Sequence, residues 1–306
     1  MPEEKTLTFA SANLFNFLAP PSACYEFDNI YDSQVWQDKC RWTQHALTQL
    51  NADIIGLQEV FSIACARDLM AEIGYPYFAT VDEPEVEKDY IYSKPVVALA
   101  SRYPITSCKA VPALVNHDHL NIPTFSRKPI CAHIDVPDLG KITVYVCHLK
   151  SQRPTETDDP DQLVGRWLST IQRGWEATML RAFMHAEYAK CPTPTVLMGD
   201  MNQSLNSDIL ASLTEPACSI TDLNLKDSWL LFDTPISRVP THYHFAKGNV
   251  LDYLLVSQEF DPNWSCSMLE IANYIVLDKH LINPHSQQDR YASDHAFIAL
   301  TVNVLV

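Results

Sequence analysis

Polar side chains that can bind a metal or move a proton stand at the ends of six apolar runs of the chain, or within them. They are Asn13, Gln58 with Glu59, His148, Asp200 with Asn202, Asp252, and Asp294 with His295. Two histidines together with several carboxylates suit proton transfer and the stabilisation of an anionic transition state. Oxygen donors such as those of Asn13, Glu59 and Asp294 suit Mg²⁺ or Mn²⁺ as the cofactor. The set therefore predicts metal-assisted acid–base chemistry.

Each of these residues taken alone also has a structural explanation. Asn13 and Asp200 are of the types that form turns and caps at strand ends, and His148 has the setting of a core histidine with satisfied partners. Asp252 is harder to explain in this way, because its neighbours are apolar and a buried carboxylate must be paired or bind something. The functional interpretation rests on the whole set.

The elements that position these residues are mostly short strands. Apolar runs predict strands at residues 7–14, 53–58, 96–101, 130–136, 142–148, 195–198, 250–257 and 296–302. Helical spacing predicts a helix over residues 36–50, with Asp32 or Ser33 as its N-cap, and another over 175–186. Many strands with few helices favour a mixed-sheet α/β or α+β body. With no repeat or linker in the chain, we expect one domain over residues 1–306.

Composition excludes several classes of protein. Only 7 glycines occur, and neither a G-x-G-x-x-G turn nor a P-loop is present, which argues against dinucleotide-binding and P-loop enzymes. A net charge of -15 argues against a basic nucleic-acid coat protein. Nine cysteines without a C-x-x-C pair indicate a reducing compartment, so we expect a cytoplasmic protein. No apolar run reaches the length of a membrane span, and we expect no membrane partner.

The polar clusters, taken in order, closely resemble the sequence blocks of the endonuclease/exonuclease/phosphatase superfamily, the deoxyribonuclease I-like metal-dependent phosphoesterases. The matching blocks are residues 11–13, 57–60, 101–105, 148–150, 199–202, 251–257 and 293–295. The resemblance implies an α/β fold of four layers, an α/β/β/α sandwich in which two mixed sheets pack face to face. The loops at the strand ends would form one catalytic cleft.

The resemblance also implies roles for individual residues. The metal ligands would be Glu59, Asn13 and Asp294, and the catalytic residues would be His148, Asp200, Asn202, Asp252 and His295. Within that set, Asp200 would orient or deprotonate the attacking water, and Asp252 would pair with His295. Arg127 matches a phosphate-contacting arginine of many members. Lys150 and Arg153, which follow His148 closely, would add positive charge for the substrate.

Some features depart from the family or stay open. Phe15 stands where abasic-site endonucleases carry an aspartate, and His148 where they use a tyrosine, which favours the deoxyribonuclease, phosphatase and sphingomyelinase branches. Glu87 or Asp89 could hold His148. Residues 18–38 form either a substrate lid or a packed loop. The His-x-His pairs at 117–119 and 242–244 lack further ligands at the spacing of a zinc site.

We therefore expect a divalent-metal-dependent phosphoesterase that hydrolyses phosphodiester bonds, as a nuclease or another phosphodiesterase. Its partner would be a phosphate-ester substrate, with nucleic acid as one candidate. Two alternatives stay open: a phosphomonoesterase such as an inositol-phosphate-type phosphatase, and a catalytically silent binding module on the same fold. A lipid phosphodiesterase ranks lower, because neither a membrane-binding hairpin nor a secretion signal is evident.

Overall fold

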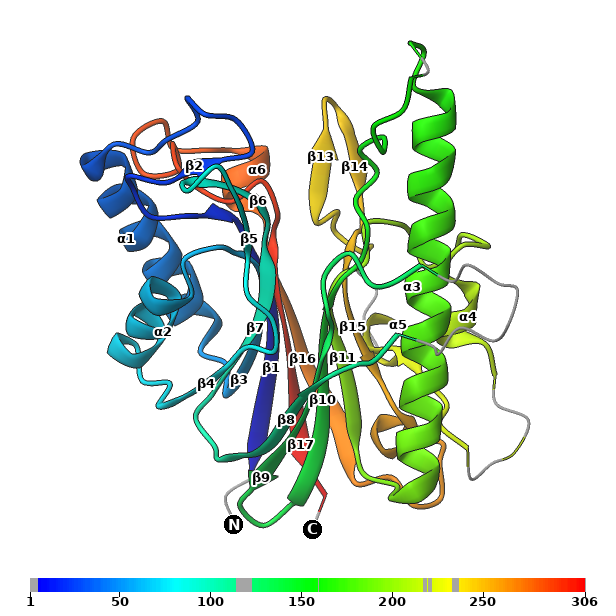
Figure 1. Ribbon diagram of the computed structural model, residues 1–306. Coiled ribbons are helices and arrows are strands. Elements are labelled where there is room, and N and C mark those ends of the chain that lie inside the picture. The colour runs from blue at the N-terminus through cyan, green and yellow to red at the C-terminus, as the bar shows by residue number, and fades with distance from the viewer. Residues whose placement is uncertain are drawn as a thin grey trace.

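Two six-stranded mixed sheets lie face to face at the centre of the described part of the molecule (Figure 1). The computed structural model describes residues 5–113, 123–158, 160–216, 219, 222–232 and 237–305. The first sheet has the order β16 (Leu269–Leu277), β17 (Phe297–Val304), β1 (Thr6–Phe17), β3 (Ile54–Val60), β7 (Val96–Ser101) and β4 (Tyr77–Ala79). The second has the order β12 (Lys226–Asp227), β15 (Asp252–Val256), β11 (Thr195–Asp200), β10 (Gly140–His148), β9 (Ile130–Val136) and β8 (Ile105–Ala110). Among these neighbours β1 runs parallel to β3, and β10 runs parallel to β11.

The inner faces of the two sheets share one apolar core. Phe9 and Ile54 of the first sheet belong to it together with Val146 and Met198 of the second. Alternate residues of these strands point the other way and form separate cores under the helices, as the two-residue period of a strand requires. Both faces of each sheet are therefore buried, which explains why the strands were recognisable as nearly continuous apolar runs.

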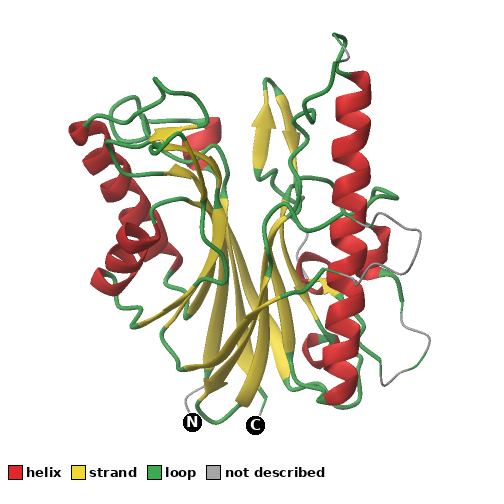
Figure 2. Ribbon diagram, in the orientation of Figure 1, coloured by secondary structure: helices red, strands yellow, loops and turns green. Residues whose placement is uncertain are grey.

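Helices cover the outer faces (Figure 2). On the first sheet lie α1 (Ser33–Leu50) and α2 (Ile63–Glu72), and on the second lie the long α3 (Leu163–Lys190) and the short α4 (Ala211–Thr214). The side chain of Asp32 caps α1 by accepting a hydrogen bond from the Val35 backbone N–H. The four-layer α/β/β/α sandwich implied by the sequence is confirmed.

The N-terminal half of α3 extends beyond the sheets at the upper end of the molecule (Figure 1). Its N-cap residue Gln162 makes no side-chain capping bond, and the Gly165 carbonyl oxygen accepts a hydrogen bond from the Thr155 backbone N–H at 3.0 Å. Leu163, Val164 and Trp167 are more than half exposed there. This part of the helix consequently has little of the core packing that holds its C-terminal half.

Small elements gather at that same end. They are a three-stranded sheet of β2 (Ala23–Cys24), β6 (Ile91–Lys94) and β5 (Glu85–Glu87), the hairpin of β13 (His242–His244) and β14 (Lys247–Asn249), and α6 (Lys279–Ile282). Elsewhere lie α5 (Ser228–Leu231) and the 3₁₀ turn η1 (Gln258–Phe260). In the segment 18–38, Leu18 and Cys24 are buried against Phe61, whereas residues 25–30 are exposed. The first part of the segment is therefore a packed loop, and its last part is the start of α1.

The expected strands all exist; β7 and β9 have the expected bounds, and the others have shifted ends. β11 continues to Asp200, two residues past the expected end, and β15 begins only at Asp252. In the described ranges, no helix is long and apolar enough to cross a membrane.

Candidate active site

Three neighbouring strands of the second sheet bring polar residues to one point. Asp200 ends β11, and its cross-strand partners are His148 of β10 and Asp252 of β15. Gly199 allows β10 and β11 to approach, because it has φ +150° and an added Cβ would lie 1.9 Å from the Cys147 carbonyl oxygen. The Gly-Asp sequence thus places a carboxylate where two strands lie unusually close.

The Oδ2 atom of Asp200 is the centre of the cluster. It accepts hydrogen bonds from the side-chain amides of Asn13 at 3.2 Å and Asn202 at 3.3 Å, while Oδ1 accepts from the Asn202 backbone N–H at 2.8 Å. The Nε2 atoms of His148 and His295 lie 3.5 and 3.8 Å from Oδ2. Two amides therefore fix the carboxylate between two imidazoles from opposite sheets.

The two histidines are held in different protonation states. Burial lowers the pKa of His295, but the charges of Asp252 and Asp200 outweigh that effect and raise it well above the usual value. Its Nδ1 lies 2.8 Å from Asp252 Oδ2. Burial, Arg127 and His295 all lower the pKa of His148. His295 is consequently the imidazolium and His148 the neutral imidazole.

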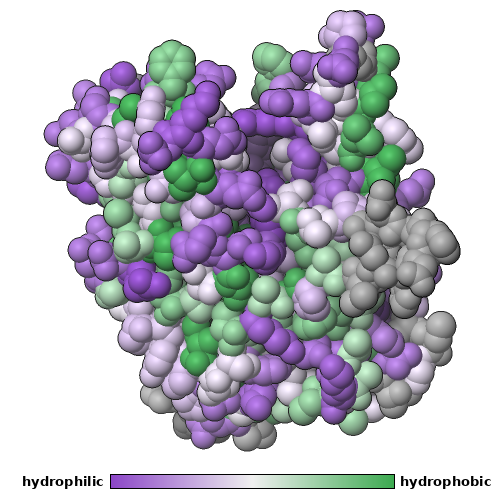
Figure 3. Space-filling view, in the orientation of Figure 1, coloured by the Kyte–Doolittle hydropathy of each residue, from purple (hydrophilic) through white to green (hydrophobic). Residues whose placement is uncertain are grey.

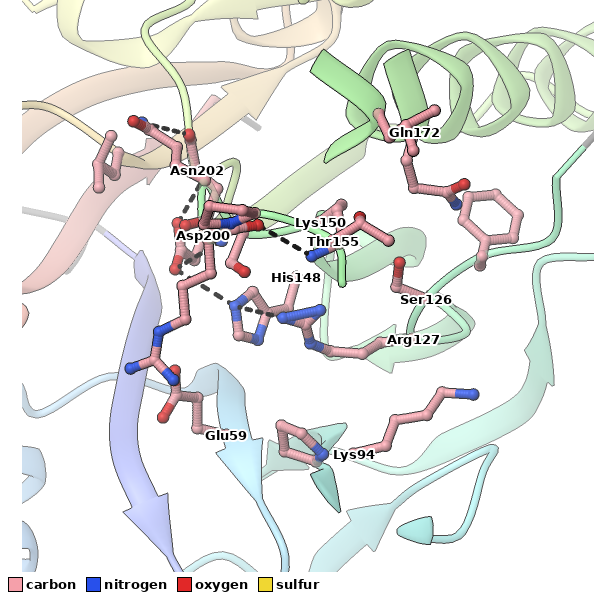
Figure 4. A pocket seen from close by; sticks show the side chains of 18 of the residues that line it. Glu59, Lys94, Ser126, Arg127, His148, Lys150, Thr155, Gln172, Asp200 and Asn202 are labelled. Carbon is pink, nitrogen blue, oxygen red and sulfur yellow. Dashed lines mark hydrogen bonds and ion pairs between the residues drawn. The ribbon is translucent and has the colours of Figure 1, made fainter. Parts of the chain in front are cut away.

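Arg127 decides how His148 is oriented. Its guanidinium lies 3.3 Å from Nε2 of His148 (Figure 4), and because a guanidinium only donates, Nε2 must accept. The buried Nδ1 of His148 has no hydrogen-bond partner in the described part of the chain. The expected acid from Glu87 or Asp89 is therefore wrong: β5, with Glu87, is exposed at the surface.

Asp200 holds its proton more tightly than an ordinary carboxylate. Burial raises its pKa to about 7, with Asp252 and Glu59 adding to the rise, while His295 and the Asn202 backbone N–H oppose it. A carboxylate whose pKa lies near neutral pH suits general-base catalysis.

Glu59 and Asn13 lie at the corresponding strand ends of the first sheet. β1 bulges between Asn13 and Phe17, and this bulge lets the Asn16 backbone N–H donate to Glu59 Oε2 at 2.8 Å. Glu59 itself has φ 59°, a left-handed conformation that costs energy in a non-glycine residue and occurs mainly at functional sites.

The donor set here fits a hard divalent cation. The Asn13 amide lies 3.5 Å from Glu59 Oε1, and Ser293 Oγ donates to the Asn13 carbonyl oxygen at 2.6 Å, which ties the 293–295 segment to β1. The buried Oδ1 of Asp294 has no hydrogen-bond partner among the described residues. Carboxylate and amide oxygens are what Mg²⁺ or Mn²⁺ takes in proteins.

A cleft of about 1640 Å³ opens over this cluster. The space-filling view shows the hollow between the two halves, with a largely hydrophilic surface (Figure 3). All three expected substrate-binding cations, Arg127, Lys150 and Arg153, line it, and so do Lys94 and Arg166. On the α3 side, Leu168, Ile171 and Trp175 give the cleft an apolar wall.

Glu176 of α3 is a positioning residue that sequence reasoning missed. Its two carboxylate oxygens accept the backbone N–H groups of Ser126 at 2.7 Å and Lys150 at 2.6 Å. One buried side chain thus holds the segments that carry Arg127 and Lys150. In the sequence of α3, Glu176 looks like an ordinary charged residue of an amphipathic helix, and only the fold brings it to those segments.

Lys39 of α1 was also missed. Its side chain is 1% exposed, and its Nζ lies 5.4 and 5.7 Å from the ring centroids of Phe15 and Tyr31. Burial lowers its pKa to about 8, although the charges of Glu59 and Asp294 oppose this. Phe15 therefore packs against a buried cation.

The model of the "Endonuclease/Exonuclease/phosphatase family" matches residues 41–295. The chain belongs to this family. Enzymes of this family are hydrolases that act on phosphate ester bonds, and the chain is such a hydrolase. No curated protein matches the sequence.

Solved structures of the family share the fold at low sequence identity. The human nocturnin catalytic domain with bound sulfate is 16% identical, with a TM-score of 0.64, covering 98% of this chain and 95% of that one. Danio rerio TDP2 in complex with a single-strand DNA product is 13% identical, with a TM-score of 0.61 and 98% and 100% coverage. A Beutenbergia cavernae endonuclease/exonuclease/phosphatase protein is 17% identical, with a TM-score of 0.60 and 98% and 72% coverage.

Two His-x-His pairs remained outside the family blocks. The pair at 117–119 lies outside the described residues. In the other pair, His242 is half-buried and packs on His295 with ring centroids 4.9 Å apart, whereas His244 is exposed.

Proposed function

We propose that this family member is a Mg²⁺- or Mn²⁺-dependent phosphodiesterase acting on nucleic acid or another extended phosphodiester. Asp200 takes the proton of the attacking water. The imidazolium of His295 donates to a phosphoryl oxygen or to the leaving oxygen, and Arg127 with Asn202 binds the remaining phosphate oxygens. A divalent ion held by Glu59, Asn13 and Asp294 would neutralise charge that develops on the phosphate.

One observation carries the proposal: Asp200 lies between a neutral and a protonated histidine. Its Oδ2 is within 4 Å of both imidazoles, and the shifted pKa values put a base and an acid at the same point. Groups whose environments push their pKa values apart in this way are the usual acid–base pair of a hydrolase.

The size of the cleft favours a diester over a small monoester. Arg127, Lys150 and Arg153 line the cleft, and an apolar wall from α3 lines the same space. An extended substrate with a phosphate flanked by bases or other flat groups fills such a site better than an isolated phosphate does. The TDP2 relative was solved with a single-strand DNA product, which makes single-stranded DNA the first substrate to test.

A panel of phosphate esters tests the proposal. The panel contains a chromogenic diester, single- and double-stranded DNA, RNA, phosphomonoesters, inositol phosphates and sphingomyelin, each with Mg²⁺ or Mn²⁺. We expect diester hydrolysis that a chelator abolishes and that Asp200→Asn lowers by about 10²–10⁴-fold. The exposed Asp208, on the loop after β11, provides the control, since Asp208→Asn should keep full activity. Hydrolysis of monoesters only, or an active Asp200→Asn variant, would contradict the proposal.

A further inference from the structure

His242, which the hydrolytic reaction does not use, forms a compact donor cluster with Asp294 and His295. One ligand atom from each residue lies within 4.8 Å of the others. His-x-His spacing alone did not supply enough ligands for a metal, but the fold adds two from a segment about fifty residues further along the chain.

The backbone holds this cluster in place. His242 and His295 form an antiparallel bridge, and the Ala296 backbone N–H donates to the Thr241 carbonyl oxygen at 2.7 Å. Thr241 Oγ1 in turn accepts from the backbone N–H groups of Leu251 and Asp252. The start of the β13–β14 hairpin is therefore anchored to the segments that carry Asp252 and His295, and the two imidazoles keep their separation without a ligand.

Two atoms of the cluster are buried and lack a partner. These are Nδ1 of His242 and Oδ1 of Asp294, neither of which has a hydrogen-bond partner in the described ranges. A buried acceptor or donor left unpaired costs about 1–3 kcal/mol. Both residues line the cleft, so an ion from solvent can reach them.

His295 already has the support that a metal-binding histidine needs. Its Nδ1 is engaged by Asp252 Oδ2 at 2.8 Å, so Nε2, 3.8 Å from Asp200 Oδ2, is the nitrogen that gives up its proton when an ion binds. A ring nitrogen held by a carboxylate while the other binds the ion is the common arrangement around protein-bound transition metals. Two imidazoles and one carboxylate, with open positions toward the cleft, suit zinc-like ions far better than Mg²⁺.

We propose that His242, Asp294 and His295 form a second metal site that takes a divalent transition-metal ion of the zinc class. Such an ion removes His295 from proton donation and Asp294 from the hard-cation set. Occupation of the site therefore opposes the Mg²⁺-dependent reaction, and micromolar transition metal would switch the enzyme off.

Binding of Zn²⁺ and Co²⁺ to the full chain in excess Mg²⁺ tests the site. We expect a stoichiometric Zn²⁺ site by competition with a chromogenic chelator, and a Co²⁺ spectrum in the visible range that reports nitrogen ligands. His242→Ala should weaken Zn²⁺ binding by about 10–100-fold or more. Loss of a residue that only supports a metal ligand already weakens metal binding by that factor, and loss of a ligand should weaken it at least as much. Zn²⁺ inhibition of hydrolysis should weaken in parallel.

His244→Ala is the matched control, because His244 belongs to the same His-x-His pair but is exposed and outside the cluster. It should bind Zn²⁺ like the unmodified protein. His242→Asn, together with the thermal unfolding curve of each variant, separates loss of a ligand from loss of the fold. The proposal is wrong if His242→Ala and His242→Asn, both folded, bind Zn²⁺ as tightly as the unmodified protein, or if His244→Ala weakens binding equally.

Discussion

At the residue scale, one carboxylate separates the two histidines into different chemical species. Asp252 lies on His295 and is absent from the surroundings of His148, where Arg127 takes its place. Two side chains of the same type therefore differ: His295 is a proton donor on one side of Asp200, and His148 is a neutral imidazole on the other. Removing the Asp252 charge should make the two rings more alike.

We expect a bell-shaped pH profile of kcat. Activity should rise as Asp200 loses its proton near pH 7 and fall as His295 loses its proton at higher pH. Because Asp252 raises the pKa of His295, Asp252→Asn should move the alkaline limb to lower pH and reduce kcat about 10²–10⁴-fold. Initial rates from pH 5 to 10 measure both limbs.

The control for this variant is another buried carboxylate of the same sheet. Asp227 of β12 lies opposite Leu255 of β15 and pairs with Arg238, without a hydrogen bond to either catalytic histidine, so Asp227→Asn should lower thermal stability without moving either limb. An alkaline limb that stays in place in Asp252→Asn would mean that His295 is not the titrating acid.

Sequence reasoning found the residues that follow strands but not those that act from helices. Asp200, His148 and Asp252 stand out because a polar group interrupts an apolar run. Glu176 and Lys39 do not, because a charged residue every few positions is ordinary on an amphipathic helix. Ser126, Lys150 and Phe15, which these two side chains contact, lie twenty or more residues away in the chain, and only tertiary packing brings them together.

At the scale of elements, α3 organises the substrate side of the cleft through Glu176. Its carboxylate is the shared acceptor for two backbone N–H groups from separate segments, and Arg173 one turn earlier donates to the Lys150 carbonyl oxygen. The helix thereby fixes the loops that carry the cations.

Glu176→Gln should loosen both loops, because the neutral amide offers one acceptor oxygen where the carboxylate offered two. We expect KM to rise more than kcat falls, and stability to drop by about 1.5–3 kcal/mol, the worth of a hydrogen bond to a charged group. Glu187→Gln on the same helix removes only solvent-facing pairs with Lys109 and Lys190. This substitution should leave KM nearly unchanged and lower the free energy of unfolding by no more than a few tenths of a kcal/mol. Equal effects of the two substitutions on KM would argue against the clamp.

Two glycines in the strands provide a comparison of backbone and side-chain crowding. An added Cβ at Gly199 would meet the Cys147 backbone, whereas at Gly56 it would meet the flexible Met198 side chain. Gly56→Ala should cost about 1–3 kcal/mol by overpacking. Gly199→Ala should cost more, since β10 and β11 must separate, and it should also displace Asp200. Denaturant unfolding of both variants checks the order, and a smaller loss for Gly199→Ala would contradict it.

The long buried strands were predictable, and the short ones were not. Strands such as β7 and β9 have the expected bounds because their apolar residues are buried on both faces. β2, β5 and β13 are two or three residues long and hold together through local pairing. Their sequences carry no two-residue period long enough to distinguish them from loops.

At the scale of the whole molecule, the layering could not be derived from periodicity. Alternating strands and helices fit several architectures, and the resemblance to the family selected the sandwich. What the sequence alone did indicate was the sign of the surface charge, since a net charge of -15 gives the exterior an excess of acidic groups.

This charge leads us to expect weak electrostatic attraction for polyanions. Local cations line the cleft, but the rest of the surface repels nucleic acid. We expect the slope of log Kobs against log[salt] on duplex DNA to indicate about two to three phosphate contacts, at roughly -0.9 per contact. Binding measured over a salt series with Ca²⁺ in place of Mg²⁺ provides the slope. A value that implies about six contacts or more would reveal an extended basic groove and favour a duplex endonuclease.

The projecting half of α3 has a consequence for motion. Helical turns without core packing open locally at a free energy far below that of global unfolding, so the amide protons near Leu163 and Trp167 should exchange with solvent rapidly. Trp175 and Glu176, closer to the sheet, should be slow. Leu168 and Ile171 lie between the rapidly and the slowly exchanging parts of the helix and also line the cleft. The part of the apolar wall formed by Leu168 and Ile171 should thus open more readily than the part formed by Trp175, and slower exchange there on addition of a ligand would report that the ligand touches it.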